Sequence, residues 1–263
     1  MIIIGEKING TIPAVAEAIK AKNGEFIREL ALRQRDAGAD YLDVAAGTAP
    51  EKEAETLKWL VEIVENAVET PVCIDSPNAD TLAAIIPAIG KPGIINSVSG
   101  EAKKCETLYP LAAKLGWKLI VLTCDDAGIP QNADRKVEIA CSLIEEAAKH
   151  GIAEQNLYID PLVLALSAVN DSLSGFTESI RKIRSKHQDV KFTLGLSNIS
   201  YGMPARKYIN RFFLAFALEA SMDSAIMDPT SKEMYAALLA AEVLLGRDRH
   251  CRNYNKAFRA GRL

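Results

Sequence analysis

The sequence predicts an α/β fold, a closed (β/α)8 barrel that occupies residues 1–263 as one domain. Short apolar strand-like runs alternate with longer amphipathic helical runs, and no linker or low-complexity stretch interrupts them. A chain of about 250 residues is also the usual length of such a barrel. An open doubly wound sheet is the alternative. It usually carries a GxGxxG fingerprint after its first strand, which residues 5–10 do not match.

Eight strand-like segments are expected. Most of their residues are apolar, as is typical of parallel strands that are covered on both faces. The segments are 2–4, 41–44, 72–75, 94–97, 117–123, 157–160, 191–196 and 224–227. Directly after the first of them, the polar sequence of residues 6–10 predicts a loop.

Helices are predicted between these strands from apolar periodicity and from start and stop signals. Residues 25–37 repeat apolar side chains at helical spacing and end before Gly38. Pro50 stands at the first position of a helix over 50–67, where proline is favoured. Signals of the same kinds predict the remaining helices, at 82–89, 102–115, 135–150, 173–186, 206–220 and 232–245.

Composition and charge indicate an ordinary globular protein. Hydrophobic residues make up 49% of the chain and charged residues 25%, and the net charge of −3 gives no reason to expect nucleic acid as a partner. Residues 247–263 hold six Lys or Arg and one Asp, a charge of +5, which leaves −8 on the rest. We interpret that stretch as a solvated or packed terminus, with contact to an acidic partner or another subunit as the alternative.

The cysteines and the first residues predict a cytoplasmic protein. Five Cys residues, an odd number without any CxxC pair, argue against a disulfide framework and against a zinc ribbon. Residues 1–7 are too short and too soon charged for a signal peptide. No uninterrupted apolar run approaches the length of a membrane span, so no membrane contact is expected.

Polar side chains stand where the predicted strands end. Asp75, Asn96 and Asp160 end three strands, and Asn198 follows a fourth. In a (β/α)8 barrel these ends share one mouth, where the chemistry takes place. Two carboxylates and two carboxamides suit a flat, nitrogen-rich heterocycle, whereas no glycine-rich loop or cluster of cations is present for a phosphate. Capping of the next helix is the alternative role of each residue taken singly.

A resemblance to a known family rests on six runs in family order. They are IGEKING at 4–10, LDVAAG at 42–47, IDS at 74–76, IINSVSG at 94–100, IDPL at 159–162 and GLSNIS at 195–200. Together they resemble the methyltetrahydrofolate:corrinoid methyltransferases over nearly the whole chain. That family belongs to the pterin-binding TIM barrels, with dihydropteroate synthase and the folate module of cobalamin-dependent methionine synthase.

The resemblance implies roles for particular residues. Asp75, Asn96 and Asp160 would hold the pterin ring, and Gly195 and Ser197 would contact it closely. Asn198 would be the catalytic residue, hydrogen-bonded to N5, the nitrogen that carries the methyl group. Arg206 and Ile226 match family positions that flank the folate.

The resemblance also implies the substrates and the partner. Tetrahydrofolate or 5-methyltetrahydrofolate is expected as substrate. The cobalamin is expected on a separate corrinoid protein, because this chain lacks an attached cobalamin module and a DxHxxG-type motif. The direction of transfer stays open. Transfer from methyl-Co(III) to tetrahydrofolate in a demethylation pathway is our hypothesis. A homodimer is expected, with helices 208–220 and 234–245 as the interface, although a stripe facing the barrel explains their apolar residues equally well.

The chain departs from the family pattern after Asn198. Tyr201 stands where the acetogenic enzymes would have a Gln, and Gly202-Met203-Pro204 replaces a more polar loop. Tyr201 and Met203 are therefore candidates for rim residues that set specificity, as are two further polar positions, Asn9 and Asp43.

Other chemistries fit the sequence less well. The histidines, at 150, 187 and 250, lie at or near predicted helix ends, so neither a His-based metal site nor a Ser-His-Asp triad is expected, and no bound metal is predicted. A dihydropteroate synthase-like enzyme is the nearest alternative. It would need a Lys and an Arg near the seventh and eighth strands for pyrophosphate, and Arg206 stands alone there. A non-catalytic folate-binding barrel also stays open.

Overall fold

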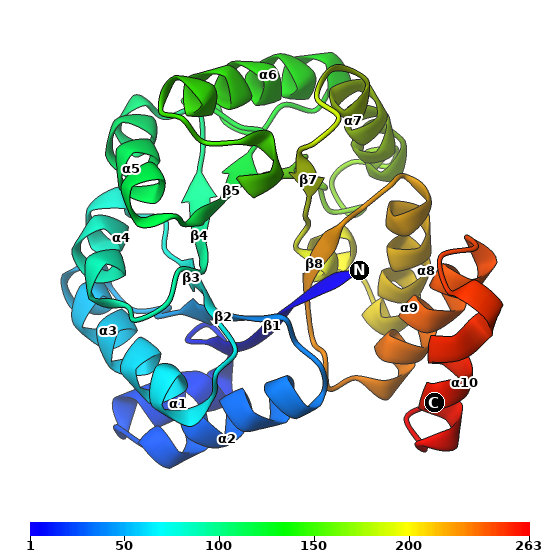
Figure 1. The fold of residues 1–263 in the computed structure, drawn as a ribbon, viewed down its shortest axis with the longest axis horizontal. Helices are drawn as coiled ribbons and strands as arrows, with labels where there is room; N and C mark the ends of the chain where they lie inside the picture. The colour runs from blue at the N-terminus through cyan, green and yellow to red at the C-terminus, as the bar shows by residue number, and fades with distance from the viewer.

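Eight parallel strands form a barrel that is surrounded by helices in the computed structural model, which describes all of residues 1–263 (Figure 1). The sheet order is β7-β6-β5-β4-β3-β2-β1-β8. The strands are β1 Ile2–Asn9, β2 Tyr41–Ala45, β3 Val72–Asp75, β4 Ile94–Val98, β5 Lys118–Leu122, β6 Leu157–Asp160, β7 Lys191–Phe192 and β8 Ser224–Met227. The predicted fold class is confirmed.

Ten α-helices cover the outside of the barrel (Figure 1). They are α1 Pro13–Lys20, α2 Gly24–Asp36, α3 Pro50–Ala67, α4 Ala79–Ile85, α5 Ala102–Leu115, α6 Ala133–Lys149, α7 Ser172–Lys186, α8 Arg206–Glu219, α9 Lys232–Leu244 and α10 Arg252–Arg259. None of them combines the length and the apolar composition needed to cross a bilayer.

Two layers of side chains place the functional end of the barrel. Most buried apolar residues lie in one large core cluster, whereas Ile4, Cys73, Ile94, Ile120 and Tyr158 form a small separate cluster, one residue from each of five strands. Side chains alternate between the two faces of a strand, so the residues two positions further along face the same way. Those residues are Glu6, Asp75, Asn96, Leu122 and Asp160. An apolar layer therefore lies directly beneath a layer that is polar except for Leu122, at the carboxyl ends of the strands.

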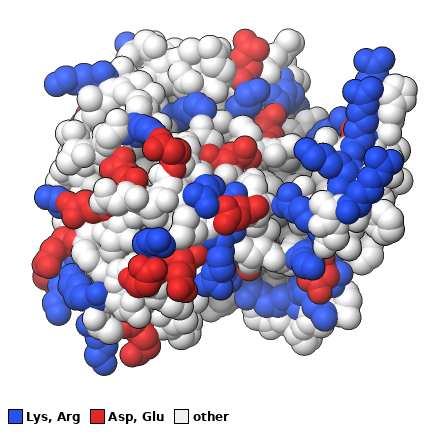
Figure 2. All heavy atoms as spheres, turned by 60° about the horizontal axis from the view of Figure 1, so that its bottom comes forward, with Lys and Arg blue, Asp and Glu red and all other residues white.

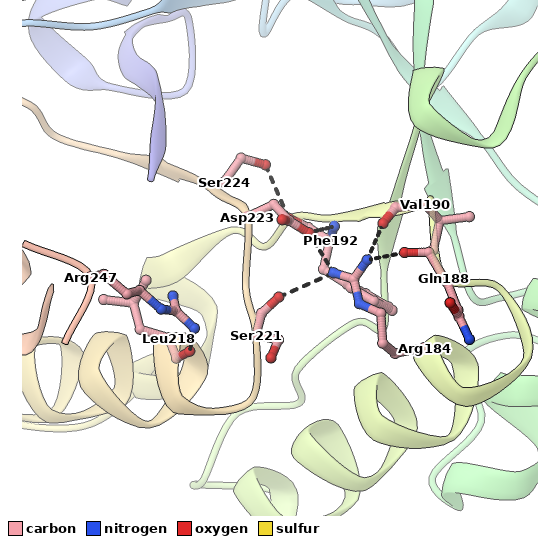
Figure 3. Close-up of polar contacts among 9 residues, drawn as sticks. All are labelled: Arg184, Gln188, Val190, Phe192, Leu218, Ser221, Asp223, Ser224 and Arg247. Carbon is pink, nitrogen blue, oxygen red and sulfur yellow. Dashed lines mark hydrogen bonds and ion pairs between the residues drawn. The ribbon is translucent and has the colours of Figure 1, made fainter. Parts of the chain in front are cut away.

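The seam between β7 and β8 combines backbone and side-chain contacts. The Asp223 N–H donates to the Phe192 carbonyl at 3.2 Å, and the Ile226 N–H donates to the Leu194 carbonyl at 2.8 Å. Backbone contact there includes a bridge between Gly195 and Ile226, but no ladder joins the two strands. At the opposite end of the seam, Asp223 accepts hydrogen bonds from the Phe192 N–H at 2.8 Å and from the Arg184 guanidinium at 2.7 Å (Figure 3). Arg184 also donates to the carbonyls of Gln188, Val190 and Ser221. The ion pair between Arg184 of α7 and Asp223 thus reinforces the backbone contacts of this seam.

The first strand differs from the prediction. A loop was expected over residues 6–10, but β1 continues to Asn9 through a bulge, in which Glu6 and Lys7 together oppose Asp43 of β2. The N–H of Lys7 donates to the side-chain oxygen of Gln34 in α2 at 3.0 Å. The loop prediction was wrong because a buried partner 27 residues away supports these polar residues within the sheet.

Other differences are local. Helix α1 and helix α10 were not predicted, and β7 ends at Phe192, after which the chain forms a 3-10 turn at Leu196–Ser200. Lys and Arg side chains gather on the side of the molecule where α10 lies (Figures 1 and 2). The carboxylate of Asp248 accepts the N–H groups of Asn253 and Tyr254 at the start of this helix. The basic stretch is therefore a packed helix rather than a free tail.

Candidate active site

A cavity of about 650 Å3 opens at the carboxyl ends of the strands. Its walls include all eight residues that the sequence proposes for binding, together with Asn9 and Asp43, so chain segments from every part of the barrel meet there. The lining is Glu6, Asn9, Thr11, Ile12, Asp43, Asp75, Ser76, Pro77, Asn96, Ser97, Lys104, Leu122, Asp160, Leu162, Gly195, Ser197, Asn198, Arg206 and Ile226.

Three polar residues from neighbouring strands form one wall. Asp75 pairs in register with Asn96, and the Asn96 amide donates to a carboxylate oxygen of Asp43 at 3.3 Å. Burial and the nearby charge of Glu53 raise the pKa of Asp75 to about 6. Burial and the charge of Asp75 also raise the pKa of Asp43 well above its usual range. This wall therefore holds protons more readily than free carboxylates do.

The opposite wall is built around Asp160. Its carboxylate accepts the N–H of Leu162 at 2.8 Å, and the Leu162 carbonyl accepts from Lys136 at 2.8 Å. These two bonds hold Leu162 in a left-handed conformation, with φ of 52°, that is unusual for a leucine. Burial raises the pKa of Asp160 to about 6, against the lowering effects of the Leu162 N–H and the Lys136 charge. Lys136 is only 3% exposed and was not predicted.

Asn198 lies in the 3-10 turn after β7 and folds back over Gly195. Its amide nitrogen is 2.8 Å from the point that a Cβ at position 195 would occupy, so a larger residue there would displace the amide. The Asn198 side chain makes no hydrogen bond within the protein, although its backbone bonds to Gly195 and Tyr201 hold the turn. The carboxamide is thus presented to the cavity with its donors and its acceptor free.

Arg206 braces this turn from α8. Its guanidinium donates to the Ser197 carbonyl at 2.6 Å and to the Ser200 hydroxyl at 3.0 Å. The side chain remains exposed at the cavity wall. Arg206 therefore fixes the backbone that carries Ser197 and Asn198, in addition to lining the cavity.

Of the four proposed rim residues, Asn9 and Asp43 line the cavity, whereas Tyr201 and Met203 lie outside its wall. Tyr201 is 71% exposed, and its carbonyl accepts the Ser167 hydroxyl at 2.8 Å, which ties the loop after β6 to the loop after β7. Met203 is partly buried beside it, and its N–H donates to the Ser200 carbonyl at 3.0 Å. Neither side chain is positioned to contact a small ligand deep in the barrel.

Glu6 is a lining residue that the sequence does not single out. The bulge in β1 brings it to the cavity, and its side chain makes no hydrogen bond or ion pair within the protein. Burial and the charge of Asp228 raise its pKa to about 7, against the opposing charges of Lys7 and Arg206. The only available signal was its place in the IGEKING run, where the polar letters indicated a loop.

The cavity resembles a ligand site more than a metal site. No group of three or more His, Cys, Asp or Glu side chains is arranged to hold a metal ion. The carboxylates and amides instead stand apart around the wall, where a planar heterocycle would meet acceptors and donors on several edges.

Comparison with known proteins agrees with this geometry. The family model described as pterin binding enzyme matches residues 6–228. The chain belongs to the pterin-binding enzyme family. The matched residues run from Glu6 at the start of the cavity wall to Asp228 directly after β8, so they include every strand end that lines the site.

Two kinds of relative share this family. A methylcorrinoid:tetrahydrofolate methyltransferase of Eubacterium limosum is 51% identical over 265 residues, which cover 100% of this chain and 98% of that protein. Methionine synthase of Mycobacterium tuberculosis is 30% identical over 241 residues, which cover 86% of this chain but 20% of that much longer protein. The resemblance inferred from the six sequence runs is confirmed.

Solved structures support the fold. A Yersinia pestis dihydropteroate synthase with a pterine-sulfa conjugate matches with a TM-score of 0.67, covering 93% of this chain and 94% of that one at 17% identity. The Xanthomonas albilineans dihydropteroate synthase in complex with 7,8-dihydropteroate matches with a TM-score of 0.64 at 18% identity, covering 93% and 91%. At such identities the likeness concerns the barrel architecture.

Proposed function

We propose that residues 1–263 form one methyltransferase domain that moves a methyl group between N5 of tetrahydrofolate and the cobalt of a corrinoid protein. The observation that carries the proposal is the free carboxamide of Asn198, held over Gly195 at the wall of a cavity that Asp75, Asn96 and Asp160 also line. The 51% identity to a methylcorrinoid:tetrahydrofolate methyltransferase supports the same reaction.

The pterin ring fits the polar layer of the barrel. Asp160 and Asp75 would accept the N–H groups of its aminopyrimidinone end, and Asn96, already oriented by its bond to Asp43, would use its free oxygen. Because both carboxylates have pKa values of about 6 without a ligand, donors on the ring would stabilise their charged forms. Ile226 would pack against the ring, and Ser197 would add a close contact.

Asn198 would act at N5. A carboxamide can accept a hydrogen bond from a protonated N5 and donate one to a free N5 lone pair, so the same residue serves both directions. The cobalt supplies either the methyl group or the nucleophile that removes it. Interactions that strengthen as charge develops on N5 raise the rate rather than the affinity.

The corrinoid is expected on a partner protein, and the direction from methyl-Co(III) to tetrahydrofolate is favoured. The relative of 51% identity, which matches this chain over 98% of its own length, is named for that direction. All five cysteines are free, as expected for a protein of the cytoplasm, which is the proposed location. Tyr201, exposed outside the cavity, would contact the arriving corrinoid protein, with Met203 beside it and Asn9 at the cavity wall.

Methyl exchange followed by absorbance tests the proposal. Stopped-flow mixing with methylcobalamin and tetrahydrofolate, and with Co(I) cobalamin and 5-methyltetrahydrofolate, should show interconversion of the two cobalt spectra. A non-catalytic folate-binding barrel would bind tetrahydrofolate without exchange. Failure of both binding and exchange would contradict the proposed function.

A dihydropteroate synthase-like activity is less compatible with the site. The cations at the cavity wall are already engaged: Lys104 pairs with Glu101 at 2.9 Å, and Arg206 bonds to its own turn. Neither is free for a pyrophosphate leaving group. Assay of dihydropteroate formation from p-aminobenzoate should give no product.

We also propose a homodimer in which α8 forms the contact. Tyr208, Phe212 and Phe216 stand at helical spacing along this helix and are 54%, 70% and 52% exposed. A ridge of three exposed aromatic side chains is typical of an interface. Light scattering should give twice the mass of 28.5 kDa, and Phe212→Asp should give the monomer.

A further inference from the structure

Glu6 is the one carboxyl group of the cavity wall whose role the proposed reaction leaves open. It lies in the cavity without a partner of its own, although the chain uses several residues to bring it there. The bulge in β1 sets Glu6 and Lys7 against the single residue Asp43. Extra residues of this kind re-aim side chains and are frequent beside active sites.

The bulge is supported by a buried side chain. Gln34 of α2 is fully buried, and its oxygen accepts the N–H of Lys7 at 3.0 Å. A Cβ at position 5 would lie 2.5 Å from that oxygen, so Gly5 is what allows the close approach. A fixed scaffold therefore holds the backbone of Glu6.

Strand register places Glu6 near the turn that carries Asn198. Gly5 pairs with Met227, so Glu6 stands beside Asp228, while Ile226 of the same strand bridges to Gly195. The Asn198 amide folds over Gly195. Neighbouring strands lie about 4.8 Å apart, so about two strand spacings separate the backbone of Glu6 from that of Gly195, and the side chains of Glu6 and Asn198 line the same cavity. That gap suits a ring with a hydrogen-bonding group on either side.

The proposed reaction needs a group that holds a proton. When methyl-Co(III) reacts with tetrahydrofolate, the N5 lone pair forms the bond to the methyl carbon. The electron pair of the cobalt–carbon bond stays on cobalt as Co(I), and the N5–H proton has to leave. In reverse, N5 gains a proton, Co(I) bonds to the methyl carbon, and the carbon–nitrogen electron pair stays on N5. The Asn198 amide can orient N5 but cannot store that proton.

We propose that Glu6 is a second catalytic residue, whose carboxylate accepts the N5 proton during methylation of tetrahydrofolate and returns it in the reverse direction. This role rests on the proposed function. The other cavity carboxyls have different tasks: Asp75 and Asp160 suit the far end of the pterin, and Asp43 is engaged by Asn96 and only 2% exposed. Asp160 adjoins the Asn198 turn from β6, but its carboxylate is already engaged by the N–H groups of Leu162 and Gly195, whereas Glu6 lies on the other side, beside β8, without such a partner.

The charges around Glu6 match this task. Asp228 after β8 is negative, whereas Lys7 on β1 and Arg206 on α8 are positive, and Lys7 pairs with Asp228 at 3.2 Å. The Asp43 carboxyl on β2 faces Glu6 across the bulge, and its own pKa is raised well above its usual range. Burial and Asp228 together raise the pKa of Glu6 to about 7. A general base or acid is most effective when its pKa lies near the working pH.

Glu6→Gln tests the role with nearly unchanged shape. Single-turnover methyl transfer in the variant should fall by about 100-fold in both directions, while the Kd for tetrahydrofolate changes by less than about threefold. In the wild type, methylation of tetrahydrofolate should rise with pH through about 7, since the base must be deprotonated, and the reverse reaction should fall over the same range. The variant should lose both dependences. The matched control is Glu25→Gln, at an exposed position on α2. This variant should have the rate and the pH dependence of the wild type.

A second variant shifts the titration without removing the carboxyl. Asp228→Asn removes a negative charge that raises the pKa of Glu6, so both pH dependences should move to lower pH. Infrared difference spectra of wild type against Glu6→Gln should contain a carboxyl band that titrates near pH 7 and moves with Asp228→Asn.

Two results would overturn the role of Glu6 while leaving the proposed function intact. One is a Glu6→Gln variant with the rate and pH dependence of the wild type. The other is a loss of rate matched by an equal loss of folate affinity, which would mean that Glu6 only binds. A wild type that binds folate but transfers no methyl group would instead overturn both proposals.

Discussion

The two ends of the barrel differ in whether their polar side chains have hydrogen-bonding partners within the protein. At the amino-terminal end of the β7–β8 seam, Asp223 is paired with Arg184 and accepts a backbone N–H (Figure 3). At the carboxyl ends of the strands, Glu6 and Asp75 have no hydrogen-bonding partner for their side chains, and Asn198 presents a free amide to the cavity. Paired groups stabilise the fold at the amino-terminal end, whereas unpaired groups at the carboxyl ends are available to a ligand.

The buried carboxyl groups of the cavity lower the stability of the ligand-free protein when they are charged. Burial raises the pKa of Asp75 and of Asp160 to about 6, so charging them above that pH costs folding free energy when no ligand is present. Functional sites commonly retain such unfavourable groups, because the ligand later supplies the missing partners. Substitutions at the two ends should therefore separate activity from stability.

Asn198→Ala should have the largest effect at the mouth. Loss of one group that acts as charge develops should lower methyl transfer by about 100- to 1,000-fold, or about 3–4 kcal/mol. The Kd for tetrahydrofolate should change by less than about threefold, because the pterin contacts remain. Single-turnover kinetics and calorimetric binding measure the two quantities. Asn255→Ala on α10 is the control, and equal losses of rate and affinity would remove the catalytic role of Asn198.

Arg184→Ala, at the amino-terminal end of the β7–β8 seam, should lower stability without lowering activity. The variant loses the ion pair with Asp223, three carbonyl contacts and the stacking of the guanidinium 4.7 Å from the Phe192 ring. The free energy of unfolding should fall by about 2–3 kcal/mol, measured by urea titration, with the single-turnover rate unchanged at 25 °C. Arg181→Ala, at an exposed pair with Glu219, should cost less than about 1 kcal/mol. A large loss of rate in Arg184→Ala would mean that the seam also shapes the site.

Much of the architecture follows from local sequence signals. The polar residues at the ends of four apolar runs line one cavity, because consecutive parallel strands bring their carboxyl ends to one face. What was missed depends on contacts that are distant in sequence. Glu6 reaches the cavity through a bulge that Gln34 supports, and Lys136 holds the Leu162 carbonyl beside Asp160 from another helix.

The missed helices have different reasons. Pro13 at the first position of α1 was a usable start signal. The helix is only eight residues long, however, and lies between the first predicted strand and the helix predicted at 25–37. Helix α10 is strongly basic, and this stretch was interpreted from its charge rather than from the spacing of its apolar residues. The capping contacts of Asp248 and the buried side chain of Ala257 hold it against α9.

Asp160→Asn should weaken folate binding but increase the stability of the ligand-free protein. Tetrahydrofolate binding should weaken by about 10- to 100-fold, because a charged acceptor is lost. Since the pKa of Asp160 is raised from 3.8 to about 6, its favourable contribution exists below pH 4 and disappears as the pH rises through 6. The ligand-free variant should therefore be more stable than the wild type by about 2–3 kcal/mol at pH 8, and the difference should vanish near pH 4. Urea titrations at both pH values check this, and a variant less stable at pH 8 would contradict it.

Tyr201→Ala should have the smallest effect and concerns only the outer rim. Because this side chain is 71% exposed and lies outside the cavity wall, folate affinity and methyl transfer with free cobalamin should not change. The KM for a corrinoid protein should rise by about five- to tenfold, as expected when an interface loses one aromatic contact. Phe258→Ala removes an equally exposed aromatic from α10 and should leave that KM unchanged. A rate loss with free cobalamin would instead place Tyr201 in the chemistry at N5, and the mouth would then extend to the loop that Ser167 holds in place.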